Sequence, residues 1–278
     1  MIVFVLLTRA AAPGRARGFS LVEMAVVLAI VGVLMSSLML TLSAQTELRN
    51  FSEAQNRLEA AREAVLAYAI ANGRLPCPAT SASAGLEVRL GTGVCGATGS
   101  ALEHYGGVSG GVTYGLLPAV TIGYQPVDSG GFAADGWGNR IRYAVSRVTT
   151  PSFSANYTNK TNMQTNGLSV LPNDLVICAS SQTISPGSSP PSCGSAASVT
   201  SQNTVVAVLY SPGKNGATTL ALGVDEAVNE NRSGANNAVF VSHVPATSTA
   251  ANGEFDDQVI WIPIGMLYSR LIAAGLLP

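Results

Sequence analysis

Residues 17–34 read RGFSLVEMAVVLAIVGVL and place one carboxylate, Glu23, at the start of an apolar run. No charged side chain occurs from Met24 to Thr46. As a helix, that stretch would be about 35 Å long, which is enough to cross the hydrocarbon core of a bilayer. Because a charged carboxylate in such a segment costs free energy, we expect Glu23 to have a function.

The charges on either side of the run predict its orientation. Arg9, Arg15 and Arg17 precede it, whereas Glu47 and Arg49 follow it. Basic residues on the N-terminal side hold that end in the cytoplasm, so the rest of the chain is expected on the other side of the membrane. A signal peptide would end at a small-residue cleavage site, but here the run continues without a break.

The segment that follows, residues 44–74, has the pattern of an amphipathic helix. The apolar side chains at helical spacing are Leu48, Phe51, Ala54, Leu58, Ala61, Val65 and Tyr68. A turn signal follows at Asn72 and Gly73. The sequence therefore predicts one helix from about Phe19 to Ala71, about 80 Å long, whose second half packs on a globular part.

Gly18, Phe19, Ser20, Leu21, Val22 and Glu23, followed by the apolar helix, resemble the class III signal of type IV prepilins and type II secretion pseudopilins. The resemblance implies that a prepilin peptidase cuts between Gly18 and Phe19 and methylates the new terminal amine. It also implies that Glu23 neutralises the Phe19 amine of a neighbouring subunit in a fibre. Two features depart from the family pattern: the leader begins with the apolar MIVFVLL, and no proline lies near Leu40.

The same resemblance implies a pilin-like α+β fold, in which the long helix packs on an antiparallel sheet. The expected parts are a leader (1–18), a membrane and assembly half of the helix (19–46), its amphipathic half (47–72) and an extracytoplasmic β-rich head (73–278). Candidate strands in the head are residues 112–117, 140–148, 175–179, 204–210, 238–242 and 258–262. A short helix is expected over 265–274, and polar loops over 151–168 and 180–203.

Four cysteines are present: Cys77, Cys95, Cys178 and Cys193. Their spacing contains no C-x-x-C pair, which disfavours a zinc site or a thioredoxin-like motif. In an oxidising compartment, two local disulfides, Cys77 with Cys95 and Cys178 with Cys193, are the simplest of three possible pairings. The alternative is four buried, reduced thiols.

Two head segments resemble elements of pseudopilins. The first, DGWGNRIRYAV at residues 135–145, resembles their D-x-W-G-N turn before a strand, with Gly136 and Gly138 permitting the turn. The second, SPGKNG at 211–216 with Asp256 and Asp257, partly resembles the calcium loop of the major pseudopilins. Paired carboxylates and loop carbonyls suit Ca²⁺, which takes six to eight oxygen ligands. Further candidate ligands are Asp225, Glu226 and Glu230. The alternative is that these are solvated loop acids, with Asp257 as a capping or turn-forming residue.

Other functions have weaker signals. The net charge is −1 and no basic stripe occurs, so no nucleic-acid partner is indicated. Residues 107–111 match G-x-S-x-G, but a second glycine and a strand-like run follow Ser109, where a nucleophile elbow needs a helix. Only two histidines are present, and nothing in the sequence orients His243 as a base.

A membrane-anchored enzyme is a third class of function, but the sequence offers no credible catalytic constellation for it. Two readings therefore remain. One is a minor pilin or pseudopilin of a type IV pilus or type II secretion fibre. Its partners would be the prepilin peptidase, other pilin subunits and an inner-membrane assembly platform. The other is a membrane-anchored extracytoplasmic binding module outside any fibre. Both place a single-pass chain in the bacterial inner membrane with its head in the periplasm, and the fibre subunit reaches the cell surface on assembly.

Overall fold

The computed structural model describes residues 18–90, 94–98, 100–147, 157–169, 171–172, 174–184, 191–216, 223–231 and 238–277, with only the backbone at 37–43. The expected leader apart from Gly18, and the last residue of the expected strand 140–148, lie outside these ranges. The chain divides into two compact units, with the boundary between Leu48 and Arg49.

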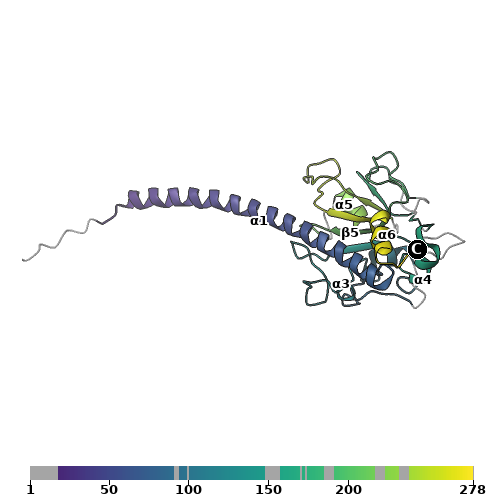
Figure 1. Ribbon diagram of the computed structural model, residues 1–278. Coiled ribbons are helices and arrows are strands. Elements are labelled where there is room, and N and C mark those ends of the chain that lie inside the picture. Colours follow the sequence, from purple (N-terminus) through teal and green to yellow (C-terminus); the bar gives the residue numbers. More distant parts are fainter. Residues whose placement is uncertain are drawn as a thin grey trace, which may run out of the picture. The chain divides into compact units, whose positions relative to one another are not determined.

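The elements follow the chain in this order: α1 (Leu21–Asn72), α2 (Ala101–Tyr105), β1 (Gly107–Ser109), β2 (Val112–Tyr114), α3 (Ala119–Ile122), β3 (Arg142–Val145), α4 (Lys160–Asn166), the 3₁₀ turn η1 (Gly167–Ser169), β4 (Val176–Cys178), β5 (Val205–Ser211), α5 (Val224–Asn229), β6 (Val239–Val241), β7 (Gln258–Pro263) and α6 (Ile264–Ala273) (Figure 1). The predicted long helix and C-terminal helix are confirmed. The fold is α+β, with a long N-terminal helix on an antiparallel sheet, as predicted for a pilin-like fold.

In the first unit, the described side chains of α1 are exposed on every face of the helix. Leu21 is 91% exposed, Leu28 66% and Val33 71%. Among the side chains that the structure describes, which leave out 37–43, no helix is long and apolar enough to cross a membrane.

In the second unit, α1 buries one face completely. Ala54, Leu58, Ala61 and Val65 are all 0% exposed, as their helical spacing predicts. Leu48, which was expected on the same face, is 69% exposed because it precedes the part of α1 that packs in the core. The small side chains at two of the four buried positions let the helix lie close to the sheet.

The central sheet has the order β3-β5-β7, and all its strands are antiparallel. One face, with Tyr143, Leu209 and Ile262, packs on α1 and on Leu267 and Leu271 of α6 (Figure 1). The other face packs on the strands β4 and β6 through a second cluster of buried residues. Its members include Ala144, Val208, Tyr210, Leu175, Ile177 and Phe240. Both faces of the sheet are therefore covered by other elements.

Two features of the head differ from the sequence expectations. The strands β4 and β6 pair in parallel, Val176 opposite Val239, because the chain returns through β5 and α5 before it reaches β6. The segment expected as a polar loop over 151–168 contains α4, where Met163 is 1% exposed and packs in the core.

In the G-x-S-x-G segment, Gly110 and Gly111 form the turn of the β1–β2 hairpin, which confirms that no nucleophile elbow is present there.

Both local disulfides are formed. Cys77 is bonded to Cys95 with a Cα–Cα distance of 5.2 Å, and Cys178 to Cys193 with 5.5 Å. The first closes the segment that follows α1, and the second joins the end of β4 to residue 193 of the expected loop 180–203. The prediction of two local loops is confirmed, and the alternative of four reduced thiols is wrong.

The turn at residues 134–140 is hydrogen-bonded to α1. Arg57 of α1 donates hydrogen bonds to the carbonyl oxygens of Ala134 (2.8 Å) and Asp135 (2.9 Å). The Asp135 Oδ1 atom accepts from the backbone N–H groups of Trp137 (2.9 Å) and Asn139 (2.8 Å), which closes the turn. The predicted turn before the strand is confirmed.

We predict that Gly136→Ala destabilises the head. A Cβ atom at this position would overlap the backbone carbonyl of Asn50 in α1, so the turn or the helix would have to move. We expect a loss of about 1–3 kcal/mol in the free energy of unfolding. Urea unfolding of the full chain in detergent, followed by tryptophan fluorescence, measures it. The matched control is Gly265→Ala, because a Cβ there meets no atom within 4 Å. Equal stabilities of the two variants would contradict the prediction.

We predict that the head loses stability in weak acid because of His104. This residue of α2 is 1% exposed, and burial lowers the pKa of its imidazole to about 4, with the charge of Arg147 adding to the effect. The unfolded chain takes up the proton first, so stability is full above the ordinary pKa of about 6.5 and falls as the pH drops toward about 4, by about 3 kcal/mol.

The measurement is the free energy of unfolding of the wild type and of His104→Gln as a function of pH. The difference between the two profiles isolates the histidine from the buried carboxyls. We expect it to be flat above pH 6.5 and to change steadily below it. A constant difference over the whole range would contradict the assignment.

Candidate functional site

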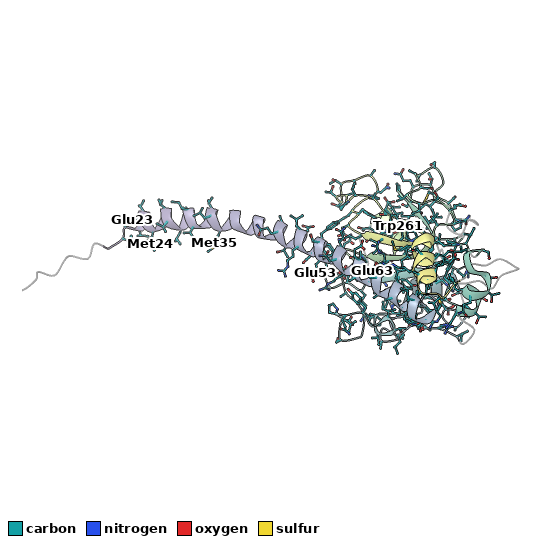
Figure 2. The ribbon with its side chains drawn as sticks, in the orientation of Figure 1. Glu23, Met24, Met35, Glu53, Glu63 and Trp261 are labelled. Carbon is teal, nitrogen blue, oxygen red and sulfur yellow. A yellow bond between two sulfur atoms is a disulfide. The ribbon has the colours of Figure 1, made fainter. Side chains whose placement is uncertain are left out.

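The start of α1 lies directly after the predicted cleavage position. Residues 18–20 are not helical, and the helix begins at Leu21. Phe19 is 77% exposed. Figure 2 shows Glu23 in the first turn of the helix. The predicted processing residues Gly18 and Phe19 therefore lie in an exposed, non-helical segment.

Ser20 and Glu23 form a capping box at this helix start. The Ser20 hydroxyl oxygen accepts a hydrogen bond from the Glu23 backbone N–H (3.2 Å), and the Glu23 carboxylate accepts one from the Ser20 N–H (3.4 Å). These two bonds satisfy backbone donors that the first turn of a helix leaves without an intrahelical partner. Ser20 was predicted only as part of the prepilin-type signal and not as a helix cap, although S-x-x-E before an apolar run is a known pattern of the capping box.

The comparison with protein families finds one match at this end of the chain. Residues 14–39 match the prokaryotic N-terminal methylation motif. This segment is the prepilin-type signal of the type IV pilin and pseudopilin family. The motif covers the exposed segment, the capping box and the uncharged start of α1. No curated protein and no solved structure was found that matches the chain.

A second candidate site lies in the head, where three carboxylates converge. Glu226 of α5 meets Asp256 and Asp257, which directly precede β7, with one oxygen of each carboxylate within 4.8 Å of the others. Glu226 is 0% exposed and Asp257 5%, and Asp256 is partly buried. The structure thus brings together the two acids that the sequence singled out and one of the three further candidates, Glu226, which comes from a different element.

Backbone and amide donors surround the cluster. Glu226 accepts from the Gly223 N–H (3.1 Å) and the Asp256 N–H (2.8 Å). Asp256 Oδ2 accepts from the Lys214 N–H (3.0 Å), and Asp257 Oδ2 from the Asn229 side chain (2.8 Å). The buried Oδ1 atom of Asp256 has no hydrogen-bond partner among the described residues.

The environment opposes ionisation of two of the three acids. Burial raises the pKa of Asp256 to about 7, and the negative charge of Glu226 adds to this effect. Burial also raises the pKa of Asp257 well above its ordinary value. Carboxylates this close together need either a bound cation or a proton on one of them to balance their charge. An oxygen-only set of this kind fits a hard cation such as Ca²⁺.

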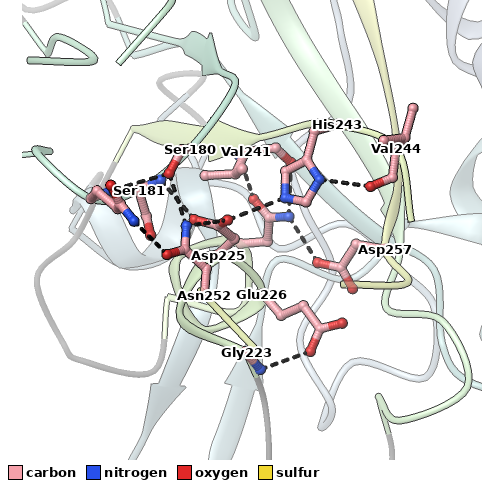
Figure 3. Close-up of polar contacts among 12 residues, drawn as sticks. Ser180, Ser181, Gly223, Asp225, Glu226, Val241, His243, Val244, Asn252 and Asp257 are labelled. Atoms are coloured by element: carbon pink, nitrogen blue, oxygen red, sulfur yellow. Dashed lines mark hydrogen bonds and ion pairs between the residues drawn. The ribbon is translucent and has the colours of Figure 1, made fainter. Parts of the chain in front are cut away.

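Asp225 and Glu230, which the sequence also offered as ligands, have other partners. Asp225 accepts from His243 (3.1 Å), the Asn252 side chain (2.9 Å) and the Ser181 N–H (2.7 Å) (Figure 3). Burial alone would raise the pKa of Asp225, but these hydrogen bonds lower it. Glu230 forms an ion pair with Arg142 at 3.0 Å. Both acids are therefore fixed outside the three-carboxylate cluster.

The 211–216 loop connects the cluster to the turn at 134–140. The Ser211 hydroxyl donates to Asp135 Oδ2 (2.5 Å), and the Asn139 amide donates to the Gly213 carbonyl (2.6 Å). The next residue of the loop, Lys214, donates its backbone N–H to Asp256. The two head motifs noted in the sequence thus form one hydrogen-bonded unit.

Proposed function

We propose that the chain is a structural subunit, a minor pilin or pseudopilin, of a type IV pilus or type II secretion fibre. The observation that carries the proposal is the methylation motif at residues 14–39. Family membership suggests a structural, non-enzymatic protein. A prepilin peptidase cuts between Gly18 and Phe19, and Phe19 becomes the N-methylated first residue.

Assembly follows from the apolar first half of α1. Its described side chains are exposed in the single chain, so they need lipid or neighbouring helices around them. In the fibre, Glu23 neutralises the Phe19 amine of the next subunit, because the two charges are tolerable in an apolar interior only as a pair. The partners are other pilin subunits and an inner-membrane assembly platform.

The head lies in the periplasm before assembly and is carried on the fibre or at the cell surface after it. Two disulfides in the head suit an oxidising compartment. The N-terminal half of α1 anchors the chain in the inner membrane, with the basic residues before it on the cytoplasmic side.

Intact mass and N-terminal sequencing of the protein from membranes, with and without prepilin peptidase, test this proposal. We expect a mature chain that starts at N-methylated Phe19 only when the peptidase is present. A chain that retains residues 1–18, or that is cut elsewhere, would leave the helix as a simple anchor and the head as a binding module.

We predict that Glu23→Gln leaves cleavage intact and reduces incorporation into fibres by more than about tenfold, because the partner amine loses its counter-charge in an apolar interior. The glutamine retains an oxygen that can accept the Ser20 N–H, so the helix start is preserved. Fractionation of sheared fibres and membranes measures the distribution. Glu47→Gln, at the end of the uncharged run, is the control. Normal incorporation of Glu23→Gln would contradict the pairing.

We also propose that Asp256 and Asp257, together with Glu226, bind a calcium ion that stabilises the head. The proposal is supported by the convergence of the three carboxylates and by the buried Asp256 Oδ1 atom without a hydrogen-bond partner among the described residues. Such an ion would join α5 to the start of β7.

We predict that millimolar calcium raises the melting temperature of the EDTA-treated full chain by about 5 °C or more, as for a ligand well above its Kd. Asp256→Asn removes a ligand charge and should abolish the shift. Glu63→Gln, an exposed carboxylate of α1, is the control and should keep it. Melting curves in detergent measure both. An unchanged wild-type melting temperature would leave the acids as a proton-sharing structural cluster.

A further inference from the structure

The capping box places the start of α1 at a fixed distance from the predicted cleavage position. Ser20 is the N-cap, Leu21 the first helical residue and Glu23 the third. The peptide bond between Gly18 and Phe19 therefore lies one residue before the cap. Among the described residues 18–24, every hydrogen bond at the start of the helix involves Ser20.

The position of the helix start matters for hydrolysis of that bond. Water adds to the Gly18 carbonyl carbon, the C–N bond breaks, and the products are a Gly18 carboxylate and a Phe19 amine. A peptidase must reach this carbonyl, which a helix would engage in an intrahelical hydrogen bond. A helix that begins at Leu21 leaves the carbonyl and the adjoining N–H free for the enzyme.

We propose that Ser20 is a positioning residue for processing. With Glu23, its cap starts α1 at Leu21 and holds the bond between Gly18 and Phe19 in the exposed, non-helical segment. What matters is a side chain at position 20 that caps the helix, and not the hydroxyl group itself. Any residue that is a good N-cap should therefore support cleavage. This inference rests on the proposed function, because it assumes cleavage by prepilin peptidase.

Three variants of the full chain test the proposal. Ser20→Ala removes the acceptor for the Glu23 N–H. Ser20→Asn keeps an N-cap oxygen but has no hydroxyl, and asparagine caps helices about as well as serine. Ser36→Ala is the matched control, because the Ser36 hydroxyl donates to the Gly32 carbonyl within the same helix and caps nothing.

The measurement is the initial rate of cleavage by purified prepilin peptidase in detergent, followed by intact mass. We expect Ser20→Ala to be cut about three- to tenfold more slowly, the range that corresponds to a lost cap. Ser20→Asn and Ser36→Ala should stay within about twofold of the wild type, since a cap is retained in both. Hydrogen exchange at the Glu23 amide reports the cap itself and should be faster only in Ser20→Ala.

The outcomes separate this proposal from the proposed function. Slow cleavage of Ser20→Asn with a protected Glu23 amide would show that the enzyme reads the hydroxyl directly, which overturns the positioning role. Cleavage of Ser20→Ala at the wild-type rate, despite fast exchange at Glu23, would overturn it as well. An uncut wild-type chain would instead overturn the proposed function, and the positioning role with it.

Discussion

The packing of one face of α1 on the central sheet is the contact on which the head depends. Ala54, Leu58, Ala61 and Val65 have no exposed surface, and the last three pack in the core cluster on the sheet face that also receives α6. Without this helix face, the apolar residues of that sheet face would meet water, at a cost of about 25 cal/mol per Å². The opposite sheet face is covered by β4 and β6. Removing the covering elements from either face would therefore expose apolar surface to water and destabilise the head.

A polar chain of contacts extends from the same helix to the carboxylate cluster. Arg57 donates a hydrogen bond to the Asp135 backbone carbonyl, and the Asp135 carboxylate accepts one from the Ser211 hydroxyl. In the loop that follows Ser211, the backbone N–H of Lys214 donates to Asp256. Each step uses a backbone group or a buried carboxylate, which fixes geometry more tightly than an exposed ion pair. A ligand that changed the charge at Asp256 would therefore act on a loop that is joined to the turn under α1.

The sequence predicted what is local and missed what depends on the fold. The helix stripe and the two short disulfide loops follow from spacing along the chain, so they were predicted correctly. The parallel pairing of β4 and β6 depends on how the chain returns through β5, which no local pattern contains. The sequence offered three further acids as ligands, and only the placement of α5 beside the start of β7 decides that Glu226 is the one that joins Asp256. Ser20 is different, since its S-x-x-E pattern was readable in the sequence.

The carboxylate of Glu23 has two partners at different stages, on the proposed function. In the uncut chain, the Phe19 nitrogen is a neutral amide, and the capping box gives Glu23 a backbone N–H but no positive charge. Cleavage turns that nitrogen into an amine, which is positively charged at neutral pH. The reaction therefore creates the cation that a carboxylate in an apolar fibre needs, one residue away from the cap. Processing then supplies the electrostatic condition for assembly, because before it a packed Glu23 would lack a counter-charge from Phe19.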